Sequence, residues 1–314
     1  MYTKIDNKKH NYIFGPVPSR RLGRSLGIDL VPFKTCSYDC IYCQLGRTTN
    51  KTIERKEWVP LRAVLGQLKN HLPSKPDYIT LSGSGEPTLY SRLEELILEI
   101  KTITDIPVAV LTNGSMLWLS DVREALKSAD MVVPSLDAGS SSIFQYVNRP
   151  HPDITFGKML RGLVDFRKIY SGQYRLEVFL LAGVTTTDAE INRIKTCIDR
   201  IKPDLVQINT VTRPPAEDFA EPVSKMQLGA IATQLYEKAE VIADYRDVHK
   251  AKDFTARRED ILTLLQRRPC TIEDIATGLG LHRNEVVKYI EELTVEGKIE
   301  AKPQNQKLYY TSLA

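Results

Sequence analysis

Thr35-Cys36-Ser37-Tyr38-Asp39-Cys40-Ile41-Tyr42-Cys43-Gln44 is the stretch that organises this sequence, because it holds three of the chain's five cysteines. Thiolates this close together form disulfides, exchange redox equivalents or share a metal. A structural zinc site has four Cys or His ligands, and the nearest histidines, His10 and His71, lie far away without paired spacing. A cubane iron–sulfur cluster normally has four thiolate ligands, so three leave one iron open to a substrate or cosubstrate. The pattern therefore predicts an iron–sulfur cluster.

The composition is that of an ordinary folded protein, with 314 residues, 42% hydrophobic and 26% charged. This length suits a barrel-sized domain and a small second one. The net charge of +4 permits an anionic partner without requiring one. Residues 1–9 lack the apolar segment of a signal peptide, and no run of about 18 apolar residues occurs. We therefore expect a cytoplasmic protein without a membrane partner, in which the isolated Cys197 and Cys270 are buried as small hydrophobic side chains.

Apolar runs bounded by turn residues alternate with amphipathic stretches, which predicts successive strand-then-helix units. The predicted strands are 28–31, 78–81, 107–111, 131–136, 176–181 and 205–208. The predicted helices are 93–100, 122–126, 156–170, 191–201 and 228–241. Such units form a parallel sheet, either doubly wound or closed into a partial barrel. The arginine- and glycine-rich segment 14–27 before the first strand is predicted to be a loop.

Polar residues follow every predicted strand, which favours the barrel. In strand-then-helix barrels the loops after the strands converge on one face, where the reactive groups lie. The segments that this arrangement gathers are the cysteine stretch, 82–87, 112–114, Ser135 with Asp137, Gly183 with Thr185, and 209–213. We therefore predict an α/β fold over residues 1–245, a partial (β/α)6 TIM-like barrel with its chemistry on one face.

The cysteine spacing resembles that of the radical SAM superfamily. Three and then two residues separate the cysteines, Tyr42 directly precedes the last one, and Ser84-Gly85-Glu86-Pro87 resembles the superfamily's usual Gly-Gly-Glu-Pro loop after the second strand. The resemblance implies one [4Fe-4S] cluster, with S-adenosyl-L-methionine (SAM) on the open iron. It also implies that Glu86 and nearby carbonyls accept hydrogen bonds from the methionyl ammonium. The implied cluster ligands are Cys36, Cys40 and Cys43.

The resemblance also implies the type of reaction. The reduced cluster passes one electron to SAM, which gives methionine and a 5′-deoxyadenosyl radical, and the radical abstracts hydrogen from a substrate that the sequence does not identify. An electron donor such as a flavodoxin or ferredoxin is implied as a partner.

Further residues at the strand ends are candidates for binding SAM. Asn113, Ser135 and Asp137 could hydrogen-bond the cosubstrate, and Tyr42 and Gly85 lie within the two motifs. Turn formation is the alternative for Asn113, since Asn-Gly is a turn signal, and helix capping is the alternative for Asp137. Glu177 is a weaker candidate, because an in-strand glutamate can simply pair with Arg175 or a neighbour.

Two segments, 135–138 and 146–150, look like the corresponding parts of wyosine-synthase-like radical SAM proteins, and the resemblance spans about residues 12–240. Wyosine synthases carry extra cysteines for a second cluster, whereas no cysteine precedes Cys36 here, so the substrate is not inherited from that group. Arginines are candidates for holding an anionic substrate, because guanidinium pairs with phosphate and carboxylate. The alternatives are a basic loop and a surface ion pair. The candidates are Arg20, Arg21, Arg24 and Arg149.

The tail reads as a separate module. Residues 246–257 are highly charged and predict a linker, and 258–314 predict three helices and a hairpin, a winged helix-turn-helix. Between 257 and 314, nine basic residues face nine acidic ones, which does not favour a strong duplex binder. We therefore prefer docking of protein or substrate. Two other interpretations remain: a tRNA-modifying enzyme with the tail as RNA dock, and an iron–sulfur-dependent transcription regulator.

Overall fold

The structure, a computed structural model, describes residues 11–19, 21–243, 258–279, 281, 283–304 and 307–313. Its main body is one curved, eight-stranded sheet with the order β1-β2-β5-β6-β7-β8-β9-β10. β1 runs antiparallel to β2 at one edge, and the other neighbours pair in parallel. The strands are β1 (Ile13–Ser19), β2 (Gly23–Ile28), β5 (Tyr78–Leu81), β6 (Val108–Thr112), β7 (Met131–Pro134), β8 (Gln173–Leu180), β9 (Leu205–Thr210) and β10 (Ala239–Val241).

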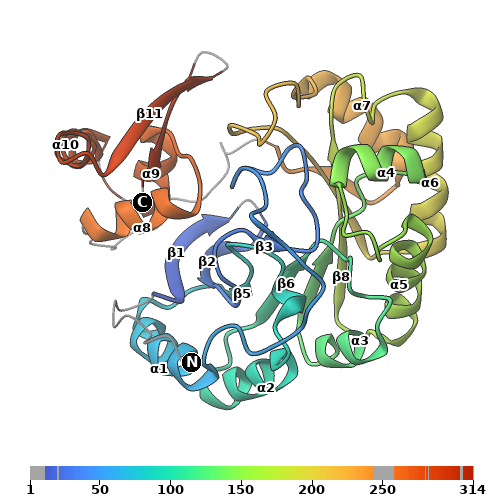
Figure 1. Ribbon diagram of the computed structural model, residues 1–314, viewed down its shortest axis with the longest axis horizontal. Coiled ribbons are helices and arrows are strands. Elements are labelled where there is room, and N and C mark those ends of the chain that lie inside the picture. The colour runs from blue at the N-terminus through green and yellow to red at the C-terminus, as the bar shows by residue number, and fades with distance from the viewer. Residues whose placement is uncertain are drawn as a thin grey trace.

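Helices cover the outer face of this sheet, as Figure 1 shows. They are α1 (Leu61–His71), α2 (Leu93–Ile103), α3 (Ser120–Leu126), α5 (Phe156–Ile169), α6 (Asp188–Ile201) and α7 (Lys225–Leu235). A further helix, α4 (Ser141–Asn148), and the 3₁₀ turns η1 (Leu72–Ser74) and η2 (Pro87–Leu89) lie in the connections between strands. In α2 the buried residues recur at helical spacing, so one stripe faces the sheet: Leu93, Leu96, Ile97 and Ile100. Strands β6 and β7 are apolar almost throughout, because both of their faces are covered.

The predicted mixed α/β fold with a largely parallel sheet is therefore confirmed. The predicted strand 78–81 is β5, and 107–111, 131–136, 176–181 and 205–208 match β6, β7, β8 and β9 to within a few residues. The sequence prediction missed α1, α4 and β10, and it extended the helix of α7 through β10.

The prediction of a loop over 14–27 is wrong, and so is the first strand at 28–31. These residues form the hairpin β1–β2, whose pairing is irregular between Phe14 and Val17. Gly27 leaves room for the Phe14 ring in this hairpin, because a Cβ there would lie 2.0 Å from the ring. Leu22, in the turn, is buried among Ala109, Met131 and Val133 and so fills the inside of the sheet.

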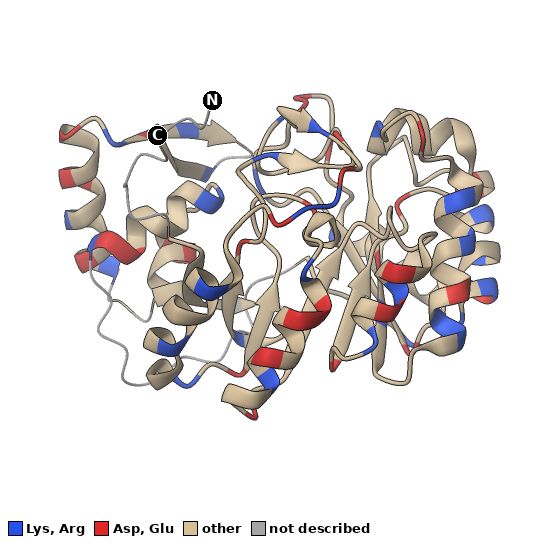
Figure 2. Ribbon diagram, turned by 60° about the horizontal axis from the view of Figure 1, so that its bottom comes forward, with Lys and Arg blue, Asp and Glu red and all other residues tan. Residues whose placement is uncertain are grey.

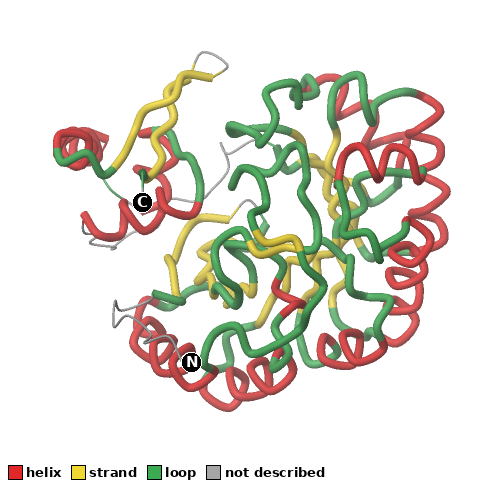
Figure 3. The backbone as a smooth tube through the Cα atoms, viewed as in Figure 1, coloured by secondary structure: helices red, strands yellow, loops and turns green. Residues whose placement is uncertain are grey.

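The loops after the parallel strands gather on one side of the sheet, which Figure 3 shows as green tube around a short pair of strands. That pair is β3 (Thr35–Cys36) and β4 (Asn50–Lys51), and it places the first cysteine at this face.

The C-terminal unit consists of three helices and a two-stranded antiparallel sheet. Its elements are α8 (Arg258–Arg267), α9 (Ile272–Leu279), α10 (Arg283–Val295), β11 (Ile299–Gln304) and β12 (Lys307–Ser312). It has its own apolar core, which includes Cys270, and Val17 of β1 packs against that core. Cys197 lies in the main core, so both isolated cysteines are buried as predicted. The predicted linker 246–257 and residues 1–9 lie outside the described residues.

Within the described ranges, the helices are too short or too polar to cross a membrane.

Candidate active site

The three motif cysteines lie on a loop that is fixed to the end of α4. Ile41 N–H donates to the Val147 carbonyl across 2.9 Å, and Asp39 N–H donates to the Asn148 carbonyl across 3.0 Å. Since α4 is a regular element with a buried face, these bonds give the loop a rigid support.

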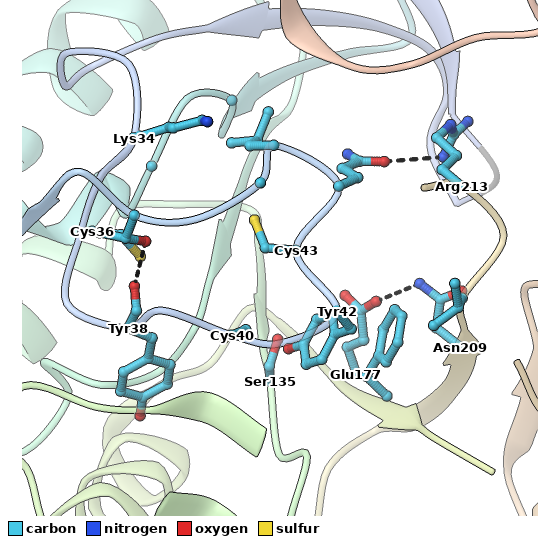
Figure 4. A pocket seen from close by; sticks show the side chains of 18 of the residues that line it. Lys34, Cys36, Tyr38, Cys40, Tyr42, Cys43, Ser135, Glu177, Asn209 and Arg213 are labelled. Carbon is cyan, nitrogen blue, oxygen red and sulfur yellow. Dashed lines mark hydrogen bonds between the residues drawn. The ribbon is translucent and has the colours of Figure 1, made fainter. Parts of the chain in front are cut away.

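All three cysteines line one cavity of about 310 Å³ at the face where the loops gather. Figure 4 shows Cys36, Cys40 and Cys43 on one side of it and Glu177, Asn209 and Arg213 on another. Segments from five parts of the sheet contribute to its walls: 34–48, 83–85, Ser135, Glu177 with Phe179, and 209–213. The cavity therefore collects four of the predicted segments at least in part, whereas 112–114, Asp137, Gly183 and Thr185 are not among its lining residues.

Two amide side chains point their donors at the cysteine sulfurs. Asn113 Nδ2 lies 3.5 Å from Cys36 Sγ, and Asn148 Nδ2 lies 3.5 Å from Cys40 Sγ. Burial, followed by the nearby Glu86 carboxylate, raises the pKa of the Cys36 thiol to about 12. Hydrogen-bond donors favour the thiolate, the form that binds metal, and so oppose this effect.

The donor set fits an iron–sulfur cluster better than a single ion. All three cysteines are free and half-buried around the cavity. Within the part of the chain that the structure describes, no three His, Cys, Asp or Glu side chains are grouped as ligands of one metal ion. In a cubane each cysteine binds a different iron, so its thiolates stand further apart than the ligands of one ion.

The loop 82–87 is joined to the start of the cysteine segment. Lys34 N–H donates to the Ser84 carbonyl across 2.7 Å, and Glu86 N–H donates to the Thr35 carbonyl across 3.1 Å. Gly85 allows this approach, because a Cβ there would lie 1.8 Å from the Thr35 carbonyl oxygen. Gly83, Ser84 and Gly85 thus line the cavity beside the cysteines.

Glu86 itself is buried behind this loop and engaged by protein donors. Its Oε1 accepts from Thr88 N–H at 3.0 Å and from the hydroxyls of Thr88 and Thr112 at 2.6 Å each, and its Oε2 accepts from Asn113 N–H at 2.7 Å. Burial raises the pKa of the Glu86 carboxyl, and these donors oppose the rise. The carboxylate joins the loops after β5 and β6, whereas the cavity wall is formed by its neighbours.

Asp137 is buried at the end of β7. Its Oδ2 accepts from the Tyr42 hydroxyl at 2.5 Å and from Asn148 Nδ2 at 2.7 Å. Burial raises the pKa of Asp137 to about 6, although both hydrogen bonds lower it. The Tyr42 ring stacks on Phe179, with 3.9 Å between ring centroids. Tyr42 and Asp137 are therefore brought together as a support of the cysteine loop, and Ser135 lies on the cavity wall.

The opposite wall carries an ion pair between two distant segments. Arg21 Nη1 lies 2.7 Å from Glu177 Oε2, and both side chains are largely buried. Asn209 Nδ2 donates to Glu177 Oε1 across 2.8 Å. Glu177 is thus paired with Arg21 rather than with Arg175, and Arg21 lines the cavity.

The other candidate arginines lie elsewhere. Arg24 donates to the Ser74 carbonyl across 2.9 Å, because it stands at the start of β2, away from the loops that follow the strands. Its placement on the substrate side is wrong. Arg149 pairs with Glu217 at 2.6 Å, as the surface-ion-pair alternative expects, and Arg47 pairs with the same carboxylate. Arg20 lies outside the described residues.

Two residues of the site carry little signal in the sequence. Asn148 contacts both Asp137 and Cys40, although the sequence analysis assigns it no role. Arg213 is 6% exposed, and its Nη1 donates to Gln44 Oε1 across 3.3 Å. Its position after a predicted strand was the available signal, since such positions meet at the same face.

Comparisons with known proteins give a matching family model and several relatives. A family model described as the Radical SAM superfamily matches residues 30–198. A curated relative named GTPase Obg, from Brachyspira hyodysenteriae, is 40% identical over 98% of this chain and 46% of its own length. A UPF0026 protein from Methanocaldococcus jannaschii is 40% identical over 67% of this chain and 66% of its own. This chain thus spans less than two thirds of the length of both relatives.

The fold also resembles solved structures. SuiB from Streptococcus suis, crystallised with S-adenosylmethionine, superposes with a TM-score of 0.52 at 14% identity, covering 71% of this chain and 51% of its own. At this identity the likeness concerns the fold alone.

Proposed function

Because this chain belongs to the radical SAM superfamily, we propose that it is an enzyme that cleaves SAM reductively to abstract hydrogen from a substrate not yet identified. Its cofactors are SAM and a [4Fe-4S] cluster, as in the superfamily. The observation that carries the proposal is one cavity lined by three cysteines and by the glycine loop, Gly83 to Gly85.

The cysteines Cys36, Cys40 and Cys43 would hold the cluster. Asn113 and Asn148 would stabilise two of the thiolates through the hydrogen bonds that already reach their sulfurs. Reductive cleavage of SAM to methionine and a 5′-deoxyadenosyl radical is the chemistry that the cluster supplies when bound. The walls of the cavity would limit the access of water to it.

SAM would lie against the loop of Gly83, Ser84 and Gly85 and beside Ser135. We assign the contacts of this loop to its backbone, because the Glu86 carboxylate is engaged by Thr88, Thr112 and Asn113. Glu86 would then act by holding the loop, and Asp137 by holding Tyr42.

The substrate would enter on the side of Arg21, Glu177 and Arg213. The similarity of 135–138 and 146–150 to the wyosine-synthase-like group supports a distant kinship within the superfamily. One set of three cysteines lines the cavity, which supports one cluster. Wyosine synthases carry extra cysteines for a second cluster, so this kinship does not identify the substrate.

The C-terminal unit would be a winged helix, since it has three helices and a β-hairpin in that order. Figure 2 shows basic and acidic ribbon segments mixed along its helices, which supports docking of protein or substrate over binding of a phosphate backbone. An electron donor such as a flavodoxin or ferredoxin would reduce the cluster.

Anaerobic reconstitution with iron and sulfide tests the proposal, followed by an assay for 5′-deoxyadenosine in the presence of dithionite. The wild type should show visible cluster absorbance and release 5′-deoxyadenosine from SAM. A triple Cys36, Cys40 and Cys43→Ala variant should lose both, whereas Cys197→Ala, which changes a cysteine in the main core, should keep both. A cluster that survives the triple change would overturn the proposal.

A further inference from the structure

The C-terminal unit reaches the active-site loops through Arg267, at the end of α8. Arg267 Nη1 donates to Ser84 Oγ across 3.0 Å, and its Nη2 donates to the Asn11 carbonyl across 3.0 Å. Ser84 belongs to the glycine loop that lines the cavity. A residue 183 positions further along the chain therefore contacts the loop to which we assign SAM.

Arg267 is held on two more sides. It forms an ion pair with Asp29, whose side chain is 6% exposed, and its guanidinium lies 4.8 Å from the centre of the Phe14 ring. A guanidinium in this position gains from the negative face of the ring as well as from the carboxylate. Arg267 therefore has a defined place between β1, Asp29 and Ser84.

Asp29, the partner of Arg267, also binds the backbone of the loop. Its Oδ1 accepts from Ser84 N–H across 2.6 Å, and a Cβ on Gly83 would lie 2.0 Å from the same oxygen. On its other side, Ser84 accepts from Lys34 N–H, two residues before Cys36. Ser84 thus lies between an anchor from the C-terminal unit and the start of the cysteine segment.

A second contact joins the C-terminal unit to another cavity loop. The Tyr309 hydroxyl of β12 donates to the Thr212 carbonyl across 2.8 Å, and Thr212 lines the cavity after β9. β1 and β10 are the two edges of the sheet, and the C-terminal unit lies beside β1 in Figure 1. The unit therefore contacts two cavity loops, one that follows β5 near the first edge of the sheet and one that follows β9 near the second.

We propose that the C-terminal unit completes the cosubstrate site, and that Arg267 is a positioning residue that fixes the loop 82–86 through Asp29 and Ser84. The inference rests on the proposed function, since it assigns SAM to that loop. The C-terminal unit would then be a working part of the active site as well as a docking module.

The experiment compares Arg267→Met and Arg267→Lys with Arg283→Met in the full-length protein. Arg283 is the matched control, because it forms an exposed ion pair with Glu273 inside the same unit. After reconstitution, SAM affinity is measured by equilibrium dialysis, and iron content and melting temperature are measured on the same samples. Arg267→Met should raise the Kd for SAM about tenfold or more, the effect of losing a charge-assisted hydrogen bond. Iron content should stay at the wild-type level.

The conservative variant and the spectrum separate positioning from general damage. Arg267→Lys keeps a charge near Asp29 and should recover part of the affinity. At saturating SAM, the electron paramagnetic resonance signal of the reduced cluster in Arg267→Met should match that of the wild type, since bound SAM would itself hold the loop in place. A Kd within twofold of wild type in Arg267→Met would overturn the inference.

A measurement without either cofactor gives an independent readout. Hydrogen exchange of the peptide that contains Ser84 should be faster in Arg267→Met than in the wild type, because the Asp29 carboxylate loses its partner. Arg283→Met should leave this exchange unchanged. Equal exchange in all three proteins would also overturn the inference. Failure of the wild type to bind SAM at all would instead count against the proposed function, with the exchange result still deciding the role of Arg267.

Discussion

Tyr42 donates a hydrogen bond to Asp137 across 2.5 Å, although 95 positions separate the two residues, and so joins the cysteine loop to the end of β7. Tyr42→Phe removes this donor and keeps the ring that stacks on Phe179. We expect a loss of about 1–3 kcal/mol in the free energy of unfolding, because a buried carboxylate loses a partner. Urea unfolding of the cluster-free protein measures it. Tyr146→Phe, which changes a half-exposed tyrosine, is the control, and equal stability of both variants would contradict the prediction.

Asp137 also gives a prediction for pH. Burial raises its pKa to about 6, above the value of about 3.9 expected in the unfolded chain. The folded state therefore binds the proton more tightly. The contribution of Asp137 to stability is fully present below about pH 4 and is lost as the pH rises through about 6.

The difference in unfolding free energy between wild type and Asp137→Asn isolates this contribution, because Asn does not titrate. The wild type should lose stability relative to Asp137→Asn as the pH rises from about 4 to 6, and the difference should stay constant above that range. Denaturant unfolding of the cluster-free proteins at several pH values measures it. A constant difference across the whole range would show that Asp137 titrates alike in both states.

The ion pair of Arg21 and Glu177 should contribute strongly to the free energy of unfolding. Arg21→Met leaves a largely buried carboxylate without its cation, which we expect to cost about 3 kcal/mol. A double-mutant cycle with Glu177→Gln should give a favourable coupling energy, measured by urea unfolding. Arg92→Met is the control, because its pairing with Glu95 is exposed to solvent, and it should have no measurable effect. Independent effects of the Arg21 and Glu177 changes would contradict the prediction.

The strands that the sequence predicts well are those with continuous apolar runs. Residues 78–81 read as a strand and form β5, since both faces of a central parallel strand are buried. The hairpin β1–β2 escapes such reasoning, because its glycines, prolines and arginines are typical of loops. What stabilises it is tertiary: Leu22 fills the inside of the sheet, and Val17 packs on the C-terminal unit.

The same limit applies to the site. Spacing alone places the three cysteines on one loop, and the strand-end rule places Ser135 and the glycine loop beside them. It does not distinguish Arg21, which reaches Glu177, from Arg24, which stands three positions on at the start of β2 and contacts Ser74. The role of Glu86 is hidden for a similar reason, because its partners Thr112 and Asn113 come from another strand end.

Gly85 gives the sharpest test of how the glycine loop meets the cysteine segment. In Gly85→Ala the new Cβ would lie 1.8 Å from the Thr35 carbonyl oxygen and 2.8 Å from Val31 Cγ2, so the loop has to move away. The hydrogen bond from Glu86 N–H to the same carbonyl would be lost with it. We expect a cost of about 1–3 kcal/mol in unfolding free energy, as for other overpacked sites, together with weaker SAM binding.

Gly66→Ala is the matched control for this change. Gly66 lies in the middle of α1 with no atom within 4 Å of a built Cβ, so alanine should stabilise the protein by about 0.5–1 kcal/mol through its helix propensity. Thermal unfolding compares the two variants, and equilibrium dialysis of the reconstituted proteins compares their SAM affinity. Gly85→Ala should unfold at a lower temperature and bind SAM more weakly than the wild type, whereas Gly66→Ala should show neither loss. If Gly85→Ala binds SAM as tightly as Gly66→Ala, the close contact with Thr35 is not what shapes the cosubstrate loop.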